Sequence, residues 1–401
     1  MKKVAIIGTV GLPANYGGFE TLVSQIVSNL NGKYDFTVYC SGKKYKKSER
    51  VKSFNEAKLK YLPFNANGIQ SIIYDSISIL HALFFADVLI ILGVAGAWLL
   101  PFVKLFTNKR IVISIDGIEW KRDKWNRVAK MYLWYAEKLA VKYSHIDISD
   151  NESIQNYTAM RYGTLSRIIE YGGDHVEYVE ATNQDLEEYP FLKYLYAVKV
   201  CRIEPENNVH LVLQAYGETT NRFLVIIGNW QNSDYGKTLK EKYKNCKNIF
   251  LLDPIYNQRT LDIIRGNAIL YIHGHSAGGT NPSLVEAMNL QLPVLAYNVS
   301  YNKTTTEHSA NYFSTIEDLK KFMASLSMEK LRKNAVFMKK IADRRYKWTI
   351  IAKKYEELIV EALSIESKPS IINKLAASQN RRYLTEYEIG HLEHQYLFYE
   401  K

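Results

Sequence analysis

Cysteine is scarce in this 401-residue chain. The three cysteines, Cys40, Cys201 and Cys246, lie far apart in the sequence. An odd number at such spacing argues against a disulfide framework and favours a reducing compartment. No cluster of histidine, cysteine and acidic residues has the spacing of metal ligands. We therefore expect neither structural disulfides nor a metal site.

Long hydrophobic runs are also missing. The longest, residues 88–103, is interrupted by glycine and proline, whereas a membrane-spanning helix needs about 20 apolar residues. We expect a buried strand followed by a buried helix there. The apolar run near the N-terminus is only Val4 to Ile7, which is too short for a signal peptide and indicates a first β-strand.

The fingerprint of dinucleotide-binding proteins is absent as well. It requires G-x-G-x-x-G directly after the first strand and an acidic residue at the end of the second. Here the first strand, 3–8, leads into Gly8-Thr9-Val10-Gly11, and the second, 36–39, is followed by Cys40 and Ser41. This argues against an NAD- or FAD-dependent oxidoreductase.

Positive charge is plentiful and unevenly spread. The net charge is +11. Residues 1–175 contain 23 Lys+Arg against 15 Asp+Glu, which leaves 29 against 26 for the rest. The run Lys43 to Lys52 is strongly basic, and a basic half suggests an anionic partner. Only Tyr45 interrupts the run as an aromatic residue, so nucleic acid is a poor candidate; a solvated loop is the alternative.

Strands and helices alternate in two successive series. Apolar strand-like segments begin at residues 3, 36, 88, 110 and 145, and again at 196, 223, 249, 268 and 293. Segments with helical apolar spacing separate them. The polar stretch 174–195 indicates an irregular linker. We expect an α/β protein with two doubly wound Rossmann-like domains, 1–175 and 176–347, and a C-terminal helix and tail, 348–401, that returns to the first domain.

One stretch carries most of the chemistry: residues 271–293, YIHGHSAGGTNPSLVEAMNLQLP. A strand leads into a glycine-rich loop, 274–280, and a helix follows with Asn281 as expected N-cap and Pro282 at its first position. Free N–H groups and the helix dipole at such an end bind phosphate. Glu286, further along the helix, suits a sugar hydroxyl better. The alternative is an ordinary solvated loop before a helix.

A second polar cluster follows the strand 110–115. It begins at Asp116 and continues through Glu119 to Arg122. Ligands bind at the carboxyl ends of strands in open α/β sheets. Asp116 and Glu119 are therefore candidates for orienting or deprotonating an acceptor, with helix capping or a structural ion pair as the alternative for each.

Several segments together resemble the family 4 GT-B glycosyltransferases over residues 1–360. They are NYGGFETLV, DGIEWKR, CRIEPENN, IIGNW and HGHSAGGTNPSLVEAM. More narrowly, these segments are similar to bacterial rhamnosyltransferases of capsule and cell-wall polysaccharide synthesis. The resemblance implies two Rossmann-like domains facing across a cleft. It also implies a retaining transferase that needs no metal or other cofactor and moves L-rhamnose from dTDP-L-rhamnose.

The resemblance also assigns roles to residues. Arg202 would pair with the donor diphosphate and carry the charge of the leaving group, Gly17 and Gly18 would approach that diphosphate, and Glu286 would bind ribose hydroxyls. The segment from Asp253 to Tyr256 would hold the base. The remaining expected donor-binding residues are Gly228, Asn229, His275, Gly278, Gly279, Thr280 and Asn281.

The chain departs from the family pattern at two positions. Gly278 stands where the family has a first glutamate, and the lysine expected soon after Arg202 is absent. The first departure leaves open how the donor sugar is held, and the second leaves Arg202 as the only obvious cation for the diphosphate. A transferase for another nucleotide sugar such as UDP-glucose, a nucleotide-sugar epimerase and a non-catalytic partner of a biosynthetic complex stay open as alternatives.

The partners implied are a nucleotide sugar and a saccharide, commonly glucose, on undecaprenyl diphosphate. Such an acceptor stays in the bilayer. We therefore expect a cytoplasmic protein at the inner face of the bacterial plasma membrane, drawn to its anionic surface by the basic first half and not associated with nucleic acid.

Overall fold

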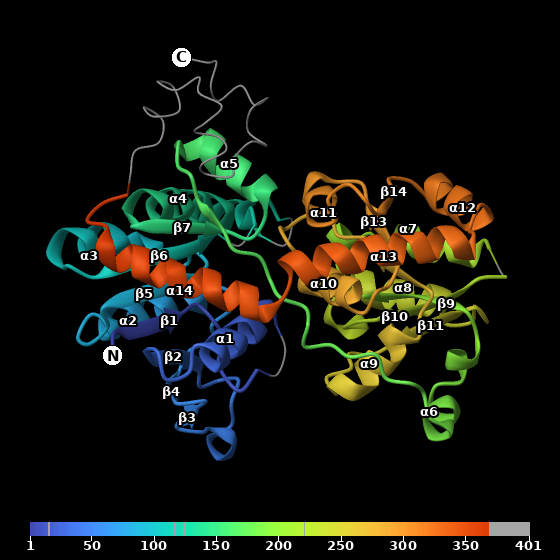
Figure 1. The fold of residues 1–401 in the computed structure, drawn as a ribbon, viewed down its shortest axis with the longest axis horizontal. Helices are drawn as coiled ribbons and strands as arrows, with labels where there is room; N and C mark the ends of the chain where they lie inside the picture. Colours follow the sequence, from blue (N-terminus) through green and yellow to red (C-terminus); the bar gives the residue numbers. More distant parts are fainter. Residues whose placement is uncertain (15–16, 116, 123–124, 220, 369–401) are drawn as a thin grey trace. The chain divides into compact units, whose positions relative to one another are not determined.

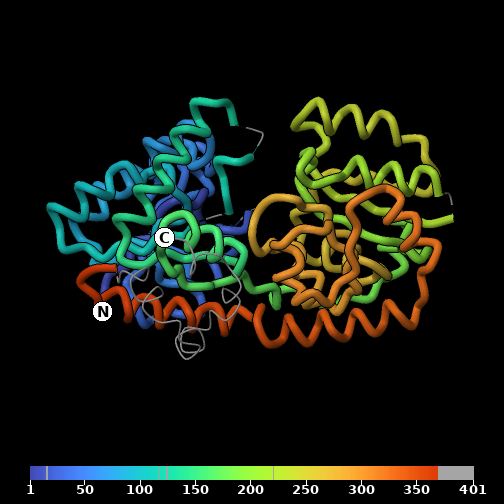
Figure 2. Tube along the Cα trace, turned by 90° about the horizontal axis from the view of Figure 1, so that it is seen from above, coloured from blue at the N-terminus to red at the C-terminus, as the bar shows by residue number. Residues whose placement is uncertain are grey.

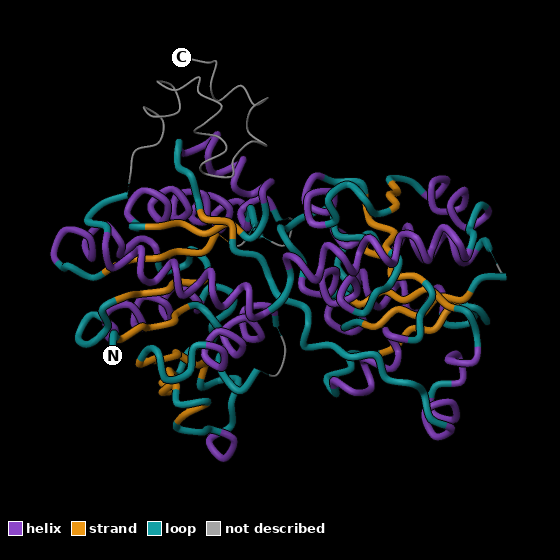
Figure 3. The backbone as a smooth tube through the Cα atoms, in the orientation of Figure 1, coloured by secondary structure: helices purple, strands orange, loops and turns teal. Residues whose placement is uncertain are grey.

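The computed structural model describes residues 1–14, 17–115, 117–122, 125–219 and 221–368. It divides the chain into two compact units (Figure 1). Of the described residues, unit 1 holds Met1–Glu170 and those from Ile351 to Lys368, and unit 2 holds Tyr171–Ile350. Each unit consists of a central sheet between helices (Figure 3).

The sheet of unit 1 has the strand order β3-β4-β2-β1-β5-β6-β7-β8. All neighbours pair in parallel except β3 and β4. Strands β1 and β5 at its centre are almost fully buried, as expected of a parallel sheet covered on both faces. The strands are β1 Lys3–Ile7, β2 Asp35–Ser41, β3 Ser53–Phe54, β4 Ala57–Leu62, β5 Val88–Leu92, β6 Arg110–Ile115, β7 Ile146–Ser149 and β8 Arg167–Ile168.

Helices cover both faces of this sheet. From β4 onward the chain moves across the sheet in one direction, so right-handed crossovers place α2, α3 and α4 on one face. Helix α14 lies on the other side of the sheet (Figure 2). The α-helices are α1 Gly18–Asn29, α2 Gln70–Ala82, α3 Leu100–Phe106, α4 Arg127–Tyr143, α5 Glu152–Tyr162 and α14 Trp348–Ser364; the short 3-10 helices are η1 Lys47–Glu49, η2 Ala97–Leu99 and η3 Glu119–Lys121.

Helix α14 comes last in the sequence and completes unit 1. Its buried side carries Ile351, Tyr355 and Ile359. Three ion pairs join it to the earlier part of the unit: Lys33–Glu356 at 2.7 Å, Arg167–Glu361 at 2.5 Å and Lys354–Glu170 at 2.6 Å. The last helix that the structure describes therefore belongs to the same unit as the start of the chain.

The sheet of unit 2 is entirely parallel, with the order β11-β10-β9-β12-β13-β14. Its strands are β9 Tyr196–Val200, β10 Phe223–Ile227, β11 Ile249–Leu252, β12 Leu270–His273, β13 Val294–Tyr297 and β14 Asn311–Phe313. The helices are α6 Asn183–Glu188, η4 Pro190–Lys193, η5 Pro205–Asn207, α7 Val209–Gly217, η6 Trp230–Asn232, α8 Asp234–Tyr243, α9 Gln258–Gly266, α10 Pro282–Asn289, α11 Ser300–Thr305, α12 Ile316–Ala324 and α13 Met328–Arg345. Buried side chains such as Leu224, Ile226 and Ile272 form its core.

The expectation of an irregular linker at 174–195 is wrong. Residues 174–182 have no regular secondary structure, but 183–193 fold onto unit 2 as α6 and η4, because Phe191 is buried against Tyr196 and Phe250, with ring centroids 5.5 and 5.1 Å apart. The sequence analysis ended the first domain after residue 175. In the structure unit 2 begins at Tyr171, and the Gly173 N–H donates to the carbonyl of Tyr346 at 2.8 Å.

The expectation of a buried helix after β5 is also wrong. The strand is buried, but α3 and the preceding turn expose Trp98, Phe102, Leu105 and Phe106. Within the described part of the chain, no helix combines the length and the apolar character needed to cross a bilayer.

Candidate active site

The glycine-rich loop 274–280 joins β12 to α10, as the sequence predicts. Asn281 caps the helix: its side-chain oxygen accepts from the Ser283 N–H at 3.0 Å, and Pro282 is the first helical residue. The predicted cap is confirmed. The N-terminus of α10 therefore presents its positive end at the carboxyl edge of the sheet, where an anion can bind.

This loop is held against the turn that follows β9. The Ser276 N–H donates to the carbonyl of Glu206 at 2.9 Å, and the Asn208 side chain donates to the carbonyl of Gly274 at 2.9 Å. A side chain at Gly274 would place its first carbon 2.3 Å from the carbonyl oxygen of Asn207, so only glycine allows this approach. The contacts position the loop independently of a ligand.

Arg202 lies in the same turn, just after β9. Its side chain is 44% exposed, and its guanidinium is 3.8 Å from the carboxylate of Glu204. A charge that is half exposed and weakly paired can reach a ligand. Asn229, after β10, accepts from the Ile203 N–H at 2.8 Å, and a Cβ at Gly228 would lie 2.4 Å from the carbonyl oxygen of Cys201.

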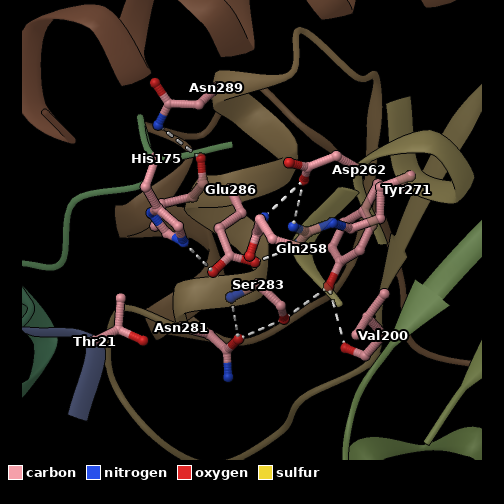
Figure 4. Close-up of polar contacts among 12 residues, drawn as sticks. Thr21, His175, Val200, Gln258, Asp262, Tyr271, Asn281, Ser283, Glu286 and Asn289 are labelled. Carbon is pink, nitrogen blue, oxygen red and sulfur yellow. Dashed lines mark hydrogen bonds and ion pairs between the residues drawn. The ribbon is translucent and has the colours of Figure 1, made fainter. Parts of the chain in front are cut away.

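The carboxylate of Glu286 already has partners within unit 2. Its carboxylate pairs with Arg265, which is fully buried, and lies 3.3 Å from His175 (Figure 4). Arg265 also pairs with Asp262 at 3.1 Å. Burial raises the pKa of Glu286, but Arg265 and then His175 outweigh it and lower that pKa to about 2. Glu286 is therefore an ionised, oriented carboxylate at neutral pH.

The sequence analysis missed both partners of Glu286. Arg265 follows Asp262 at helical spacing, which by itself resembles an ordinary surface ion pair. His175 lay in the supposed linker. Only the tertiary structure brings the three segments together.

Two buried basic residues lie next to the loop: Lys199, which the sequence did not single out, and His273, which the sequence offered, like His275, as a possible hydrogen-bond donor to the sugar or phosphate. The Lys199 and His273 side chains are completely buried and make no hydrogen bond with any described residue. Burial lowers the pKa of both groups, and for His273 the nearby Lys199 lowers it further. The ring of His273 stacks on that of His275, with centroids 4.3 Å apart and 11° between the planes.

In unit 1, Gly17 and Gly18 begin α1 after β1. Gly17 has φ 131°, and a Cβ there would lie 1.8 Å from a carboxylate oxygen of Glu20. Glu20 itself is buried and accepts from the Thr9 hydroxyl at 2.9 Å and the Val10 N–H at 2.7 Å. Glu20, which the sequence analysis did not single out, holds the loop that ends at the two glycines.

Glu119 has structural partners in the same unit. Its carboxylate accepts from the Trp125 indole N–H at 2.9 Å and pairs with Arg122 at 3.0 Å. Asp116, the other acceptor-side candidate, lies outside the described residues. No group of histidine, cysteine and acidic residues in the described part of the chain could hold a metal ion.

The expected donor-binding residues of unit 2 thus lie at the carboxyl ends of neighbouring strands. Arg202 follows β9, Gly228 and Asn229 follow β10, and the loop with His275, Gly278, Gly279 and Thr280 follows β12; β9 lies between the other two strands. Tyr256 follows β11 at the edge of the sheet and is 65% exposed.

Two family models match the chain. Residues 183–345 match "Glycosyl transferases group 1", and residues 1–174 match "Domain of unknown function (DUF1972)". The match to the glycosyl transferases group 1 model thus lies within unit 2. No curated protein matches the chain.

Solved structures share the fold over nearly their whole length. Sucrose-phosphate synthase from Thermosynechococcus elongatus has a TM-score of 0.73 at 13% identity and covers 90% of this chain and 99% of its own. HepE from Anabaena in complex with UDP-glucose has a TM-score of 0.70 at 15% identity, and the match covers 90% of this chain and 100% of HepE. A glycosyltransferase from Rickettsia africae has a TM-score of 0.67 at 13% identity, and the match covers 90% of this chain and 99% of that protein. The chain therefore has the GT-B fold, with two Rossmann-like domains.

Proposed function

We propose that this chain, whose second unit contains the match to the glycosyl transferases group 1 model, is a retaining glycosyltransferase that takes its sugar from a nucleotide sugar. The observation that carries the proposal is the arrangement at the carboxyl edge of the unit 2 sheet. The N-terminus of α10, the loop 274–280 and the half-exposed Arg202 meet there on adjacent strands. A diphosphate fits this combination of helix end, backbone N–H groups and guanidinium.

Each group has a part in the reaction. As the bond from the sugar to the diphosphate breaks, negative charge grows on the leaving phosphate. Arg202 and the N–H groups at the start of α10 stabilise that charge, which lowers the barrier more than it strengthens ground-state binding. Glu286, ionised and oriented by Arg265, accepts hydrogen bonds from hydroxyl groups of the donor. No metal or other cofactor is part of this proposal.

The donor that we propose is dTDP-L-rhamnose, on the resemblance of the motifs to bacterial rhamnosyltransferases. Gly278 in place of a carboxylate is consistent with a 6-deoxy sugar, which offers one hydroxyl fewer. UDP-glucose is the second candidate, because HepE, a protein of the same fold, was solved in complex with UDP-glucose.

The acceptor that we propose is a saccharide on a lipid diphosphate, with the enzyme at an anionic membrane surface. The excess of positive charge in residues 1–175 supports this location. Asp116 or Glu119 is the acceptor-orienting group in this proposal, and Gly17 and Gly18 approach both the donor diphosphate and the acceptor.

Incubation with labelled dTDP- and UDP-sugars and a lipid-diphosphate-glucose acceptor tests the function. Arg202→Ala should lower kcat by about 10²–10³-fold, because the charge that Arg202 meets develops in the transition state. Arg222→Ala is the matched control: Arg222 precedes β10, at the opposite end of that strand from Gly228, and its guanidinium donates to the carbonyl of Met323. Unchanged turnover in Arg202→Ala would show that another group carries the leaving-group charge, and no transfer from any donor would overturn the proposal.

A further inference from the structure

Large apolar side chains gather on one exposed side of unit 1. Of the 24 large hydrophobic residues exposed in the described chain, 13 lie between positions 69 and 135, on or beside α2, η2, α3 and α4. We name this set the apolar face. It consists of Ile69, Ile73, Ile77, Leu80, Phe84, Trp98, Phe102, Leu105, Phe106, Val128, Met131, Trp134 and Tyr135.

Helix α2 shows that this exposure is not incidental. Its outward stripe, at spacings of three and four residues, is apolar from Ile69 to Phe84, and Phe84 is 89% exposed. Its inward side is mixed and carries Tyr74, Ile79 and Ala82 together with Asp75, Ser76 and Ser78. Because the outward side of a surface helix is ordinarily polar, this outward apolar stripe indicates a second apolar environment outside unit 1.

The elements of the apolar face contact one another. The Trp98 indole N–H donates to the Ser76 hydroxyl of α2 at 2.9 Å, and the Tyr132 hydroxyl of α4 donates to the carbonyl of Ala95 at 2.5 Å. The crossover directions place α2, α3 and α4 on the side of the sheet away from α14 (Figures 1 and 2). The apolar residues therefore form one surface.

The charges of these helices select the partner. Helices α2, α3 and α4, described throughout, carry five lysines and arginines, whereas both of their acids, Asp75 and Glu137, are buried. The cations are Lys104, Arg127, Lys130, Lys138 and Lys142. In a symmetric pair of copies the same positive patch would meet itself. Exposed apolar residues beside lysines, with tryptophan and tyrosine among them, fit the interface of an anionic bilayer instead.

A pocket of about 360 Å³ opens within the same surface. It is lined by Trp120, Lys121, Lys130, Met131 and Trp134. The guanidinium carbon of Arg161 lies 4.9 Å from the centroids of both tryptophan rings and so braces the pocket wall. Two lysines beside braced aromatic rings suit a phosphate carried on an apolar chain.

We infer that the apolar face lies on an anionic lipid bilayer and that this pocket receives the phosphate-bearing head group of a lipid. The inference rests on the proposed function only in identifying that lipid with the acceptor. It places the main membrane contact on α2, α3 and α4. The sequence pointed to the basic run Lys43–Lys52 and offered the residues near Trp98 to Phe106 as a shallow anchor only if they were exposed.

Co-sedimentation of the full chain with vesicles tests the surface. The wild type should bind phosphatidylglycerol vesicles, bind phosphatidylcholine vesicles more weakly, and be released from phosphatidylglycerol by salt. Leu105→Ser with Phe106→Ser should weaken binding at least tenfold. The control is Val336→Ser with Phe337→Ser, an exposed apolar pair on α13, which should bind as the wild type does.

Two results would overturn the inference that the apolar face contacts the membrane. One is wild-type vesicle binding by the Leu105/Phe106 variant. The other is a dimer of the wild type in light scattering that the same two changes dissociate while vesicle binding stays the same. The apolar face would then join two copies of the chain and not contact the membrane. Calorimetry with dTDP- and UDP-sugars separates this test from the proposed function: donor binding concerns unit 2 and should be equal in all variants.

The pocket is tested with geranyl diphosphate, read through tryptophan fluorescence. The wild type should saturate, and inorganic diphosphate should bind more weakly because it lacks the apolar chain. Lys121→Gln with Lys130→Gln should lower the affinity at least tenfold, while Lys138→Gln with Lys142→Gln, also on the basic side of unit 1, should not. If the two pairs of changes have equal effects, general surface charge explains the binding, and the assignment of the pocket as a lipid head-group site is overturned.

Discussion

Arg265 shows how much a single buried residue can decide. It lies fully buried in α9 between two carboxylates, Asp262 and Glu286. Arg265→Met should lower the free energy of unfolding of unit 2 by about 3–5 kcal/mol, because it removes the cation that pairs with the buried Asp262 and the partly buried Glu286. Urea unfolding measures the loss. Arg259→Met on the same helix is the control, since Arg259 pairs with Asp185 at 3.1 Å but is half exposed and should lose much less. Equal losses would contradict this reading.

His273 should make the stability of unit 2 depend on pH. Its pKa in the folded protein lies well below 6.5, because burial and Lys199 disfavour the charged form. The unfolded chain therefore binds more protons below pH 6.5, and stability falls as the pH is lowered through that value, by at most about 1.4 kcal/mol per pH unit from this group. Urea unfolding at pH 7.5 and 5.5 should show a smaller drop for His273→Phe than for the wild type; equal drops would remove His273 as the cause.

At the scale of the element, the observed cap of α10 can be separated from its proposed role as an anion site. Asn281→Ala removes the cap and should cost about 1 kcal/mol. Asn257→Ala, the control, removes the corresponding cap of α9, whose side chain accepts from the Thr260 N–H at 3.0 Å. Both changes should lower stability similarly, but only Asn281→Ala should weaken nucleotide-sugar binding in calorimetry. Equal donor affinity in the two variants would separate the start of α10 from the donor.

At the scale of the whole molecule, α14 makes unit 1 depend on the far end of the chain. Ile359 is fully buried in unit 1, and its neighbour Val360 is 57% exposed. Ile359→Ala should cost about 2–5 kcal/mol through the cavity that it leaves, and Val360→Ala should stay within about 0.5 kcal/mol. Hydrogen exchange should show faster opening in peptides of 1–170 and unchanged exchange in those of 171–350. Uniform acceleration would mean that the two units unfold as one.

The sequence by itself determined the succession of strands and helices, the two doubly wound units and the cap at Asn281. These follow from local patterns: apolar runs of strand length, helical spacing and a glycine loop before Asn-Pro. Such patterns are written in neighbouring residues, and the parallel sheets of the structure confirm them.

The tertiary structure alone decided which side chains meet. Glu286 was recognised as a carboxylate near an anion site, but its pairing with Arg265 and His175 joins segments that are far apart in the sequence. The same holds for the surface. The sequence pattern of an apolar stripe in α2 is the same whether the stripe faces the core or the solvent, because helical spacing shows that a stripe exists but not which way it points. Only the packing of α2, which buries Asp75 together with Ile79, shows that Ile73 and Leu80 lie on the exposed side.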